Sequence, residues 1–137
     1  MAKTANVQEL DFEIQFYEGL LKKLPDFPNA LLALGDCYTK RGLYEKGLEV
    51  DKKLALLQPE DPFILYNLGC SYSLLNQLDL AFRSIKRSVN CGYTNFGYMG
   101  QDPDLDNLRK DVRFQRYFSR LMRLKISVSE TDDTDIL

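Results

Sequence analysis

Apolar residues recur along this chain at intervals of three and four residues, which is the spacing of one face of an α-helix. The N-terminal run of such positions contains Leu10, Ile14, Tyr17, Leu20, Leu21 and Leu24. Pro25 ends the run, because proline cannot continue a helix. The pattern predicts an all-α protein with a first helix inside residues 8–27, after a flexible N-terminus at residues 1–7.

A shift of 34 residues lays segment 28–61 onto segment 62–95. The matching pairs are Pro28 with Pro62, Leu31 with Leu65, Leu34 with Leu68, Gly35 with Gly69, and Tyr38 with Tyr72. Gly42 and Asn76 divide each segment into two helices, since both residue types tolerate the left-handed conformation that ends a helix. Asp61 followed by Pro62 is a helix start. We therefore expect two helical hairpins, preceded by the lone helix as a half-unit.

These residues resemble the tetratricopeptide repeat family, whose pattern is Leu-Gly-x-x-Tyr, a small residue, an apolar residue and a closing Pro. The two copies read Leu31, Leu34, Gly35, Tyr38, Gly47, Leu54, Pro59 and Leu65, Leu68, Gly69, Tyr72, Ala81, Ile85, Ser88. Leu replaces the family's Trp, Gly47 replaces its Ala, and Tyr93 replaces the final Pro. The resemblance implies a short right-handed α-solenoid of antiparallel helix hairpins with an N-terminal capping helix.

The repeat pattern stops after Val89, and a glycine-rich stretch leads to Asp102-Pro103-Asp104-Leu105-Asp106-Asn107-Leu108-Arg109. Together with Asp111-Val112-Arg113-Phe114, this stretch resembles a closing segment found behind bacterial tetratricopeptide arrays. We expect residues 96–125 to cap the array and to end in an amphipathic helix. Residues 126–137 are polar and acidic, so we expect a disordered tail there.

At 137 residues the chain fits one domain. Its formal charge of −2 is unevenly distributed, since residues 71–128 carry ten basic and five acidic side chains. Three cysteines without a Cys-x-x-Cys spacing indicate reduced thiols that serve packing. The N-terminus lacks the apolar core of a signal peptide, so we expect a cytoplasmic protein.

Residues that support catalysis are scarce in this sequence. It has no histidine, which removes the commonest general base and metal ligand, and it has no phosphate-binding loop. Asp102, Asp104 and Asp106 lack the glycine and distal glutamate of a calcium loop, so a helix-capping turn is the favoured interpretation. We expect no enzyme activity, no cofactor and no metal site.

The resemblance instead implies a binding groove on the concave side, formed by the first helix of each repeat. Its predicted residues are Asn29, Leu32, Asp36, Thr39, Lys40, Phe63, Tyr66, Asn67, Cys70, Ser73 and Leu74. The family's clamp for C-terminal carboxylates is not expected, because Leu32 and Asp36 stand at first-helix places of its Lys and Asn. We predict an adaptor or scaffold that binds an apolar peptide with a positive charge near Asp36, held mainly by Phe63 and Tyr66.

Three alternatives stay open at this point. The protein is a small chaperone for a secreted or assembly substrate, it associates with itself through an uncapped repeat face, or it binds anions such as nucleic acid or a membrane surface. The third rests on a basic stripe predicted at helical spacing, which comprises Arg109, Arg113, Arg116, Arg120 and Arg123. The acidic residues Glu130, Asp132, Asp133 and Asp135 of the tail would then compete for this stripe within the same chain.

Overall fold

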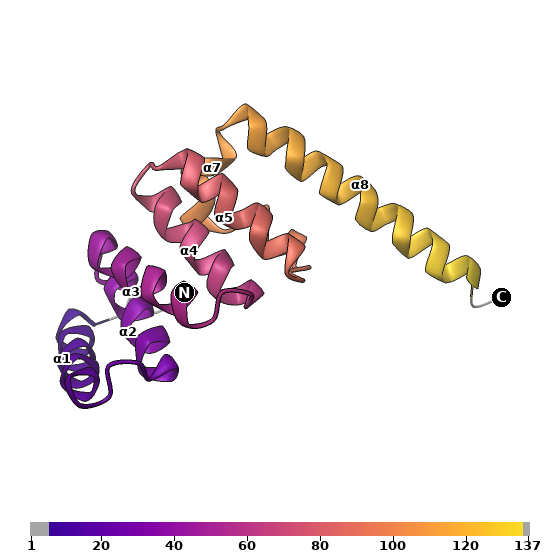
Figure 1. Ribbon diagram of the computed structural model, residues 1–137. Helices are drawn as coiled ribbons and strands as arrows, with labels where there is room; N and C mark the ends of the chain where they lie inside the picture. The colour runs from indigo at the N-terminus through magenta and orange to yellow at the C-terminus, as the bar shows by residue number, and fades with distance from the viewer. Residues whose placement is uncertain (1–5, 136–137) are drawn as a thin grey trace.

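The computed structural model describes residues 6–135, and it describes side chains as far as residue 125. Over that range the protein is all-α, as the sequence predicts, and it forms a row of helices that pack on their neighbours (Figure 1). The elements are α1 (Val7–Lys23), α2 (Pro28–Lys40), α3 (Tyr44–Leu57), α4 (Pro62–Leu74), α5 (Leu78–Asn90), α6 (Phe96–Met99), the 3-10 helix η1 (Pro103–Leu105), α7 (Asp106–Arg109) and α8 (Val112–Asp135).

The turns that the sequence predicts are present. Gly42 separates α2 from α3 with a φ of 82°, and Asn76 separates α4 from α5 with a φ of 59°. The carboxylate of Asp61 caps α4 by accepting hydrogen bonds from the backbone N–H groups of Phe63 and Ile64, at 2.9 and 3.1 Å. Local sequence therefore fixes where these two helical hairpins begin and turn.

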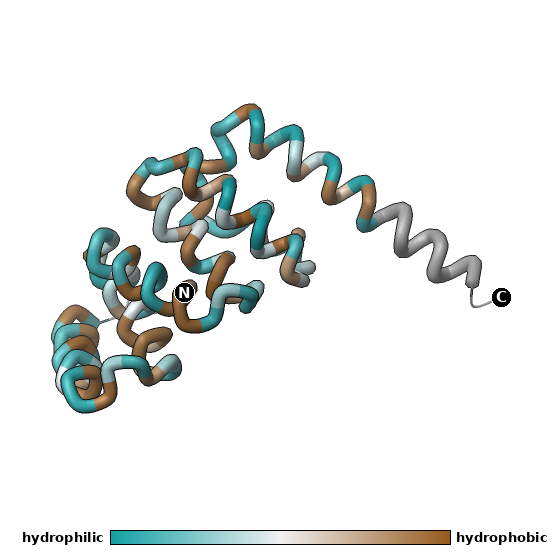
Figure 2. The backbone as a smooth tube through the Cα atoms, in the orientation of Figure 1, coloured by the Kyte–Doolittle hydropathy of each residue, from teal (hydrophilic) through white to brown (hydrophobic). Residues whose placement is uncertain are grey.

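The apolar core follows the row of helices in three clusters. Leu10 and Ile14 of α1 pack on Leu34, Cys37 and Tyr38 of α2, so α1 covers the outer flank of the first hairpin as predicted. A middle cluster joins the two hairpins through Leu31, Leu54 and Ile64. The largest cluster runs from α4 through α5 and the capping segment to Phe114 and Leu121 of α8. Figure 2 shows that each long helix carries both apolar and polar positions, as amphipathic helices do.

The segment after α5 folds back over the second hairpin. It consists of residues 93–109, which we call the capping segment, and its η1 and α7 pack on α4. Met99, Leu105 and Leu108 are fully buried in this contact. These buried residues lie inside the range 96–125 for which a cap is expected, and they cover the second hairpin.

Two predictions about the C-terminal region are wrong. Helix α8 extends to Asp135, so the backbone of residues 126–135 is helical rather than disordered (Figure 1). Arg109 lies on α7 and not on α8, because Asp111 caps a new helix by accepting the N–H of Arg113 at 2.9 Å. A continuous helix also removes the flexible tether by which the tail would reach the basic stripe. The tail carboxylates themselves lie outside the described side chains.

We also searched the described helices for a segment that is long and apolar enough to cross a membrane, and we found none.

Candidate functional site

The predicted groove residues divide into an exposed group and a covered group. On α2, Asn29, Leu32, Asp36 and Lys40 are exposed, and Thr39 is half-buried. On α4, Phe63 and Asn67 are exposed, whereas Leu74 is half-buried. The other three predicted groove residues of α4 are buried, and they are Tyr66, Cys70 and Ser73.

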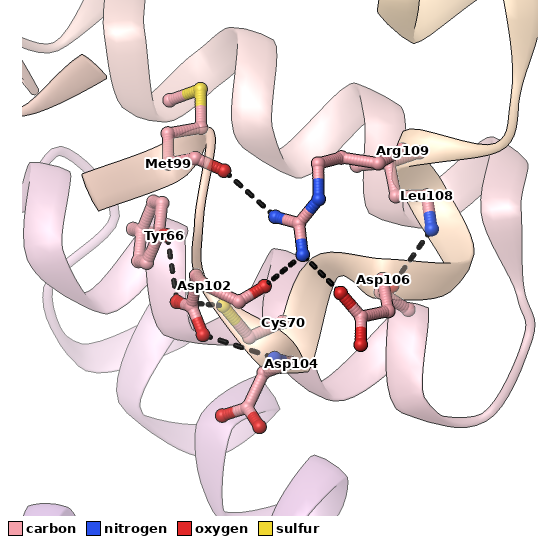
Figure 3. Close-up of polar contacts among 9 residues, drawn as sticks. Tyr66, Cys70, Met99, Asp102, Asp104, Asp106, Leu108 and Arg109 are labelled. Atoms are coloured by element: carbon pink, nitrogen blue, oxygen red, sulfur yellow. Dashed lines mark hydrogen bonds and ion pairs between the residues drawn. The ribbon is translucent and has the colours of Figure 1, made fainter. Parts of the chain in front are cut away.

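The capping segment covers these three side chains, and Figure 3 shows Tyr66 and Cys70 beside Asp102. The Tyr66 hydroxyl donates to Oδ2 of Asp102 at 2.7 Å, and the Cys70 thiol donates to the same oxygen at 3.7 Å. Ser73 is held by α7, where its hydroxyl accepts the N–H of Leu108 at 3.2 Å. The prediction that Tyr66, Cys70 and Ser73 meet a partner is therefore wrong for this structure, because the chain itself fills that half of the groove.

Aromatic stacking reinforces this covering. The ring of Tyr93 lies parallel to that of Tyr66, with centroids 4.3 Å apart, and Tyr98 approaches the same ring at 6.3 Å. Phe63 meets the edge of Tyr93 at 6.0 Å. Two tyrosines, Tyr93 and Tyr98, thus occupy the place against Tyr66 where the sequence alone predicts an apolar peptide.

Arg109 bonds to three other residues of the capping segment (Figure 3). Its guanidinium donates to the carbonyl of Met99 at 3.0 Å and to the carbonyl of Asp102 at 2.5 Å, and it pairs with Asp106. The Asp102 carbonyl also accepts the N–H of Leu105 at 3.0 Å, so Arg109 connects the start of η1 to the end of α6. Arg109 is therefore a structural residue and does not belong to a basic stripe.

Asp102 and Asp106 have separate roles in the capping segment. Asp102 is buried, and its Oδ1 caps η1 by accepting the N–H of Asp104 at 3.0 Å. Asp106 pairs with Arg109. The capping interpretation is thus confirmed for Asp102. Asp102 also accepts the hydrogen bond from Tyr66. The local sequence does not predict this bond, because the two residues are 36 positions apart.

A small cleft stays open where α2, α3, α4 and η1 meet. Its volume is about 80 Å³, well below the roughly 300–1,000 Å³ of small-molecule sites, so it suits a single side-chain end. It is lined by Gly35, Asp36, Thr39, Asp51, Asn67, Cys70, Ser71, Leu74 and Asp104. Three of these residues are aspartates, and no basic residue is among them.

The two inner aspartates have raised pKa values. Burial raises the pKa of Asp51 to about 6, although the Ser71 hydroxyl bonded to it opposes the shift. Burial also raises the pKa of Asp104, and nearby Asp102, Asp36 and Asp106 add to the effect. A cation in the cleft would relieve this concentration of carboxylates.

Beneath the cleft, burial raises the pKa of the Cys70 thiol well above its usual range, and the Asp102 carboxylate raises it further. The pKa of the Cys37 thiol is raised to about 11 by burial and by its bond to Glu13. Both thiols are therefore held in the protonated, unreactive form. This agrees with the packing role predicted from the sequence.

The basic stripe is shorter than predicted. Besides the loss of Arg109, Arg113 pairs with Asp79 and with Asp111, each at 2.7 Å. Arg116, Arg120 and Arg123 remain, and they line one shallow depression on α8 together with Gln115 and Ser119. Within the described side chains these three arginines form no ion pair.

No protein-family model matches the chain. A segment of 80 residues is 34% identical to a protein of Arabidopsis thaliana that is named as chloroplastic. This alignment covers 56% of the present chain but 24% of that protein. The chain thus matches about a quarter of the relative's length, so the similarity supports a shared segment and does not carry over the role of the whole protein.

Proposed function

We propose that this chain is a tetratricopeptide-type interaction module that binds a segment of a partner protein in the open half of its concave groove. The 34-residue sequence period and the two helical hairpins support this family assignment. Such hairpin stacks offer a concave surface to extended or helical peptides. In this chain the capping segment reduces that surface to the face of α2 and the exposed side chains of α4.

The observation that carries the proposal is the acidic cleft with exposed apolar side chains on the same two helices. Asp36, Asn67 and Asp104 line the cleft, while Phe63 is 67% exposed and Leu32 is 38% exposed. An Arg or Lys side chain of the partner would enter the cleft, and apolar partner residues would cover Phe63 and Leu32.

Lys40 forms an ion pair with Asp36, which is one of the residues that line the cleft. Its ammonium lies 2.8 Å from the Asp36 carboxylate, and both side chains are more than half exposed. An exposed ion pair of this kind is worth only about 0–1 kcal/mol, so a partner cation exchanges with it at little cost. This exchange makes the proposed recognition sensitive to salt.

The proposal includes no catalytic step. The cleft offers carboxylates, an amide, hydroxyls and a thiol whose pKa is raised, and a protein-binding role uses them as hydrogen-bond and charge partners. The cytoplasmic location expected from the sequence stays a prediction, since the similar plant protein is named for the chloroplast.

A peptide-display selection against the full chain tests this function. We expect enriched peptides to combine a Lys or Arg with an apolar or aromatic neighbour. Phe63→Ala should weaken binding of the selected peptide by about 2 kcal/mol, roughly 30-fold, because exposed aromatics carry much of an interface's energy. Asp36→Lys should weaken it as well, and more strongly at low salt.

Matched controls exist outside the groove. Leu56 on α3 is at least as exposed as Phe63, and Glu60 lies in the loop before α4. Leu56→Ala and Glu60→Lys are an analogous truncation of an exposed apolar side chain and an analogous charge reversal, and both should leave affinity unchanged. If the groove variants bind the peptide as well as these controls do, the groove is not the binding site.

A further inference from the structure

Among the described residues, the first helix of the row has an exposed apolar face. The side of α1 that carries Leu10 and Ile14 packs on α2, whereas Phe12 and Phe16 on another side are 71% and 58% exposed. These two rings lie four residues apart and therefore on the same side of the helix. Glu9, Phe12 and Glu13 line one surface depression with Asn6 and Gln8. We call the set Glu9, Phe12, Glu13 and Phe16 the α1 face.

The last helix has a face of opposite charge. Arg116, Arg120 and Arg123 are exposed along α8, and Leu124 beside them is 62% exposed. Between Val112 and Lys125 the helix has five basic residues and no Asp or Glu. The inner side of α8 is occupied, since Phe114 and Leu121 are buried against the body. We call the set Arg116, Arg120, Arg123 and Leu124 the α8 face.

The two faces also match in spacing. Glu9 and Glu13 are four residues apart, as are Arg116 and Arg120, so each pair of charges is separated by about 6 Å along its helix. Each face adds at least one large apolar side chain close to its charges. Two helices laid side by side can therefore pair both carboxylates with arginines and cover Phe16 or Phe12 with Leu124.

We propose that the α8 face of one copy binds the α1 face of a second copy, so that the protein associates head to tail. The partner is a second copy because a single chain carries both complementary charge patterns at opposite ends of its helix row (Figure 1). The contact joins two different surfaces and is heterologous, so it leaves one free face of each kind at the ends of a dimer. Further copies add to these ends, and the products are open chains or a closed ring.

The contact is distinct from the groove of the proposed function. None of the eight residues of the two faces lines the cleft between α2, α4 and η1. Asp36→Lys therefore removes the proposed peptide binding without affecting association, and the two proposals fail independently.

Two double variants of the full chain test the proposal. The α1 variant carries Glu9→Lys and Phe12→Ser, and the α8 variant carries Arg116→Glu and Arg120→Glu. All four side chains are exposed, so both variants should keep the helical circular-dichroism spectrum of the parent. Sedimentation velocity at low ionic strength should show concentration-dependent association of the parent and monomers for each variant alone.

Mixing the two variants is the decisive experiment. The α1 variant retains an intact α8 face and the α8 variant retains an intact α1 face, so the mixture should form a one-to-one dimer and nothing larger. Association of the parent should weaken at least tenfold between about 0.1 M and about 1 M salt, because the screening length of charges falls from about 10 Å to about 3 Å over that range.

Several results would overturn head-to-tail binding. A parent protein that stays monomeric at high micromolar concentration would contradict head-to-tail binding. This holds even if the protein binds anionic vesicles or an acidic polymer through its arginines. Variants that remain monomers when mixed would also contradict it. If the α1 variant is monomeric while the α8 variant still associates, the contact joins two α1 helices instead.

Discussion

At the residue scale, the closest helix contacts depend on glycine. A Cβ placed on Gly69 of α4 would lie 2.6 Å from Cδ1 of Ile85 and 3.3 Å from the carbonyl oxygen of Ala81, both on α5. The predicted small positions behave similarly, since Ala81 is fully buried and a Cβ on Gly47 would lie 3.2 Å from Oγ1 of Thr39. The two helices of each hairpin approach this closely because one side chain is missing or small.

We predict opposite effects for two glycine-to-alanine changes. Gly69→Ala should destabilise the fold by about 1–3 kcal/mol, because Ile85 must move from a filled site. Gly19→Ala should stabilise it by up to about 1 kcal/mol, because Gly19 lies inside α1 with no atom within 4 Å of the added carbon. Urea unfolding of both variants measures the difference, and equal stabilities would contradict the assigned packing.

Asp51 should make stability depend on pH. Its pKa is raised to about 6 by burial, above the value near 3.9 of an unfolded chain, so the folded state holds the proton more tightly. Below about pH 4 the carboxyl is protonated in both the folded and the unfolded state, so it does not lower the free energy of unfolding. That free energy falls as pH rises through about 6, where the folded state must also lose the proton. The loss above pH 6 should be on the order of 2–3 kcal/mol.

Asp51→Asn isolates this contribution, because the amide oxygen can still accept the hydrogen bond from Ser71. The variant should gain stability relative to the parent as pH rises from about 4 to about 6. Chemical unfolding at a series of pH values measures the gain. Parallel stability curves for the two proteins would show that Asp51 titrates normally.

At the scale of elements, the capping segment occupies a place that the repeat pattern alone leaves for a partner. It buries Tyr66, Cys70 and Ser73 through one carboxylate, one backbone N–H and a stack of tyrosines. Asp102 connects this segment to α4, since it bonds Tyr66 while capping η1. The segment therefore covers the second hairpin and sets how much of the groove stays open.

We predict that Asp102→Ala loosens the capping segment. The Tyr66 hydroxyl would lose its buried acceptor, at a cost of about 1–3 kcal/mol. Cys70 should then react faster with a thiol reagent, while Cys37 under α1 stays protected. Mass spectrometry of the labelled peptides distinguishes the two sites.

Asp106→Ala serves as the comparison in the same segment. Its exposed carboxylate contacts only Arg109 among the described hydrogen bonds and ion pairs, so its loss should leave Cys70 protected. Equal reactivity of Cys70 in both variants would show that Asp102 does not hold the segment in place.

At the scale of the whole molecule, each helix depends mainly on its neighbours in the row. The three core clusters follow one another from α1 to α8, and Leu31, Leu54 and Ile64 link the two hairpins. Within the described residues, the two end helices of the row expose different side chains. Here the first helix offers exposed phenylalanines between glutamates, and the last helix offers arginines. The head-to-tail proposal follows from this polarity of the row.

The sequence by itself determined the first helix and the helices and turns of the two hairpins. Those features depend on contacts close in the chain: proline at the helix starts, Asp61 as a cap, and Gly42 and Asn76 in the left-handed conformation. The 34-residue period also located α1 as a half-unit that covers the first hairpin. The extent of α8 was missed, because a polar composition alone argued for disorder where the backbone is helical.

Only the tertiary structure decided which groove residues are open to a partner. Tyr66 and Asn67 are adjacent in the sequence, yet one is buried under Asp102 and the other lines the cleft. Arg109 and Arg116 fit one helical stripe by spacing, but a new helix start at Asp111 separates them. The burial of Tyr66 depends on a contact between residues 36 positions apart, and the local periodicity of a sequence contains no information about such a contact. The break at Asp111 is local, since its carboxylate accepts the N–H of Arg113 two positions along, but the spacing of the arginines alone does not reveal it.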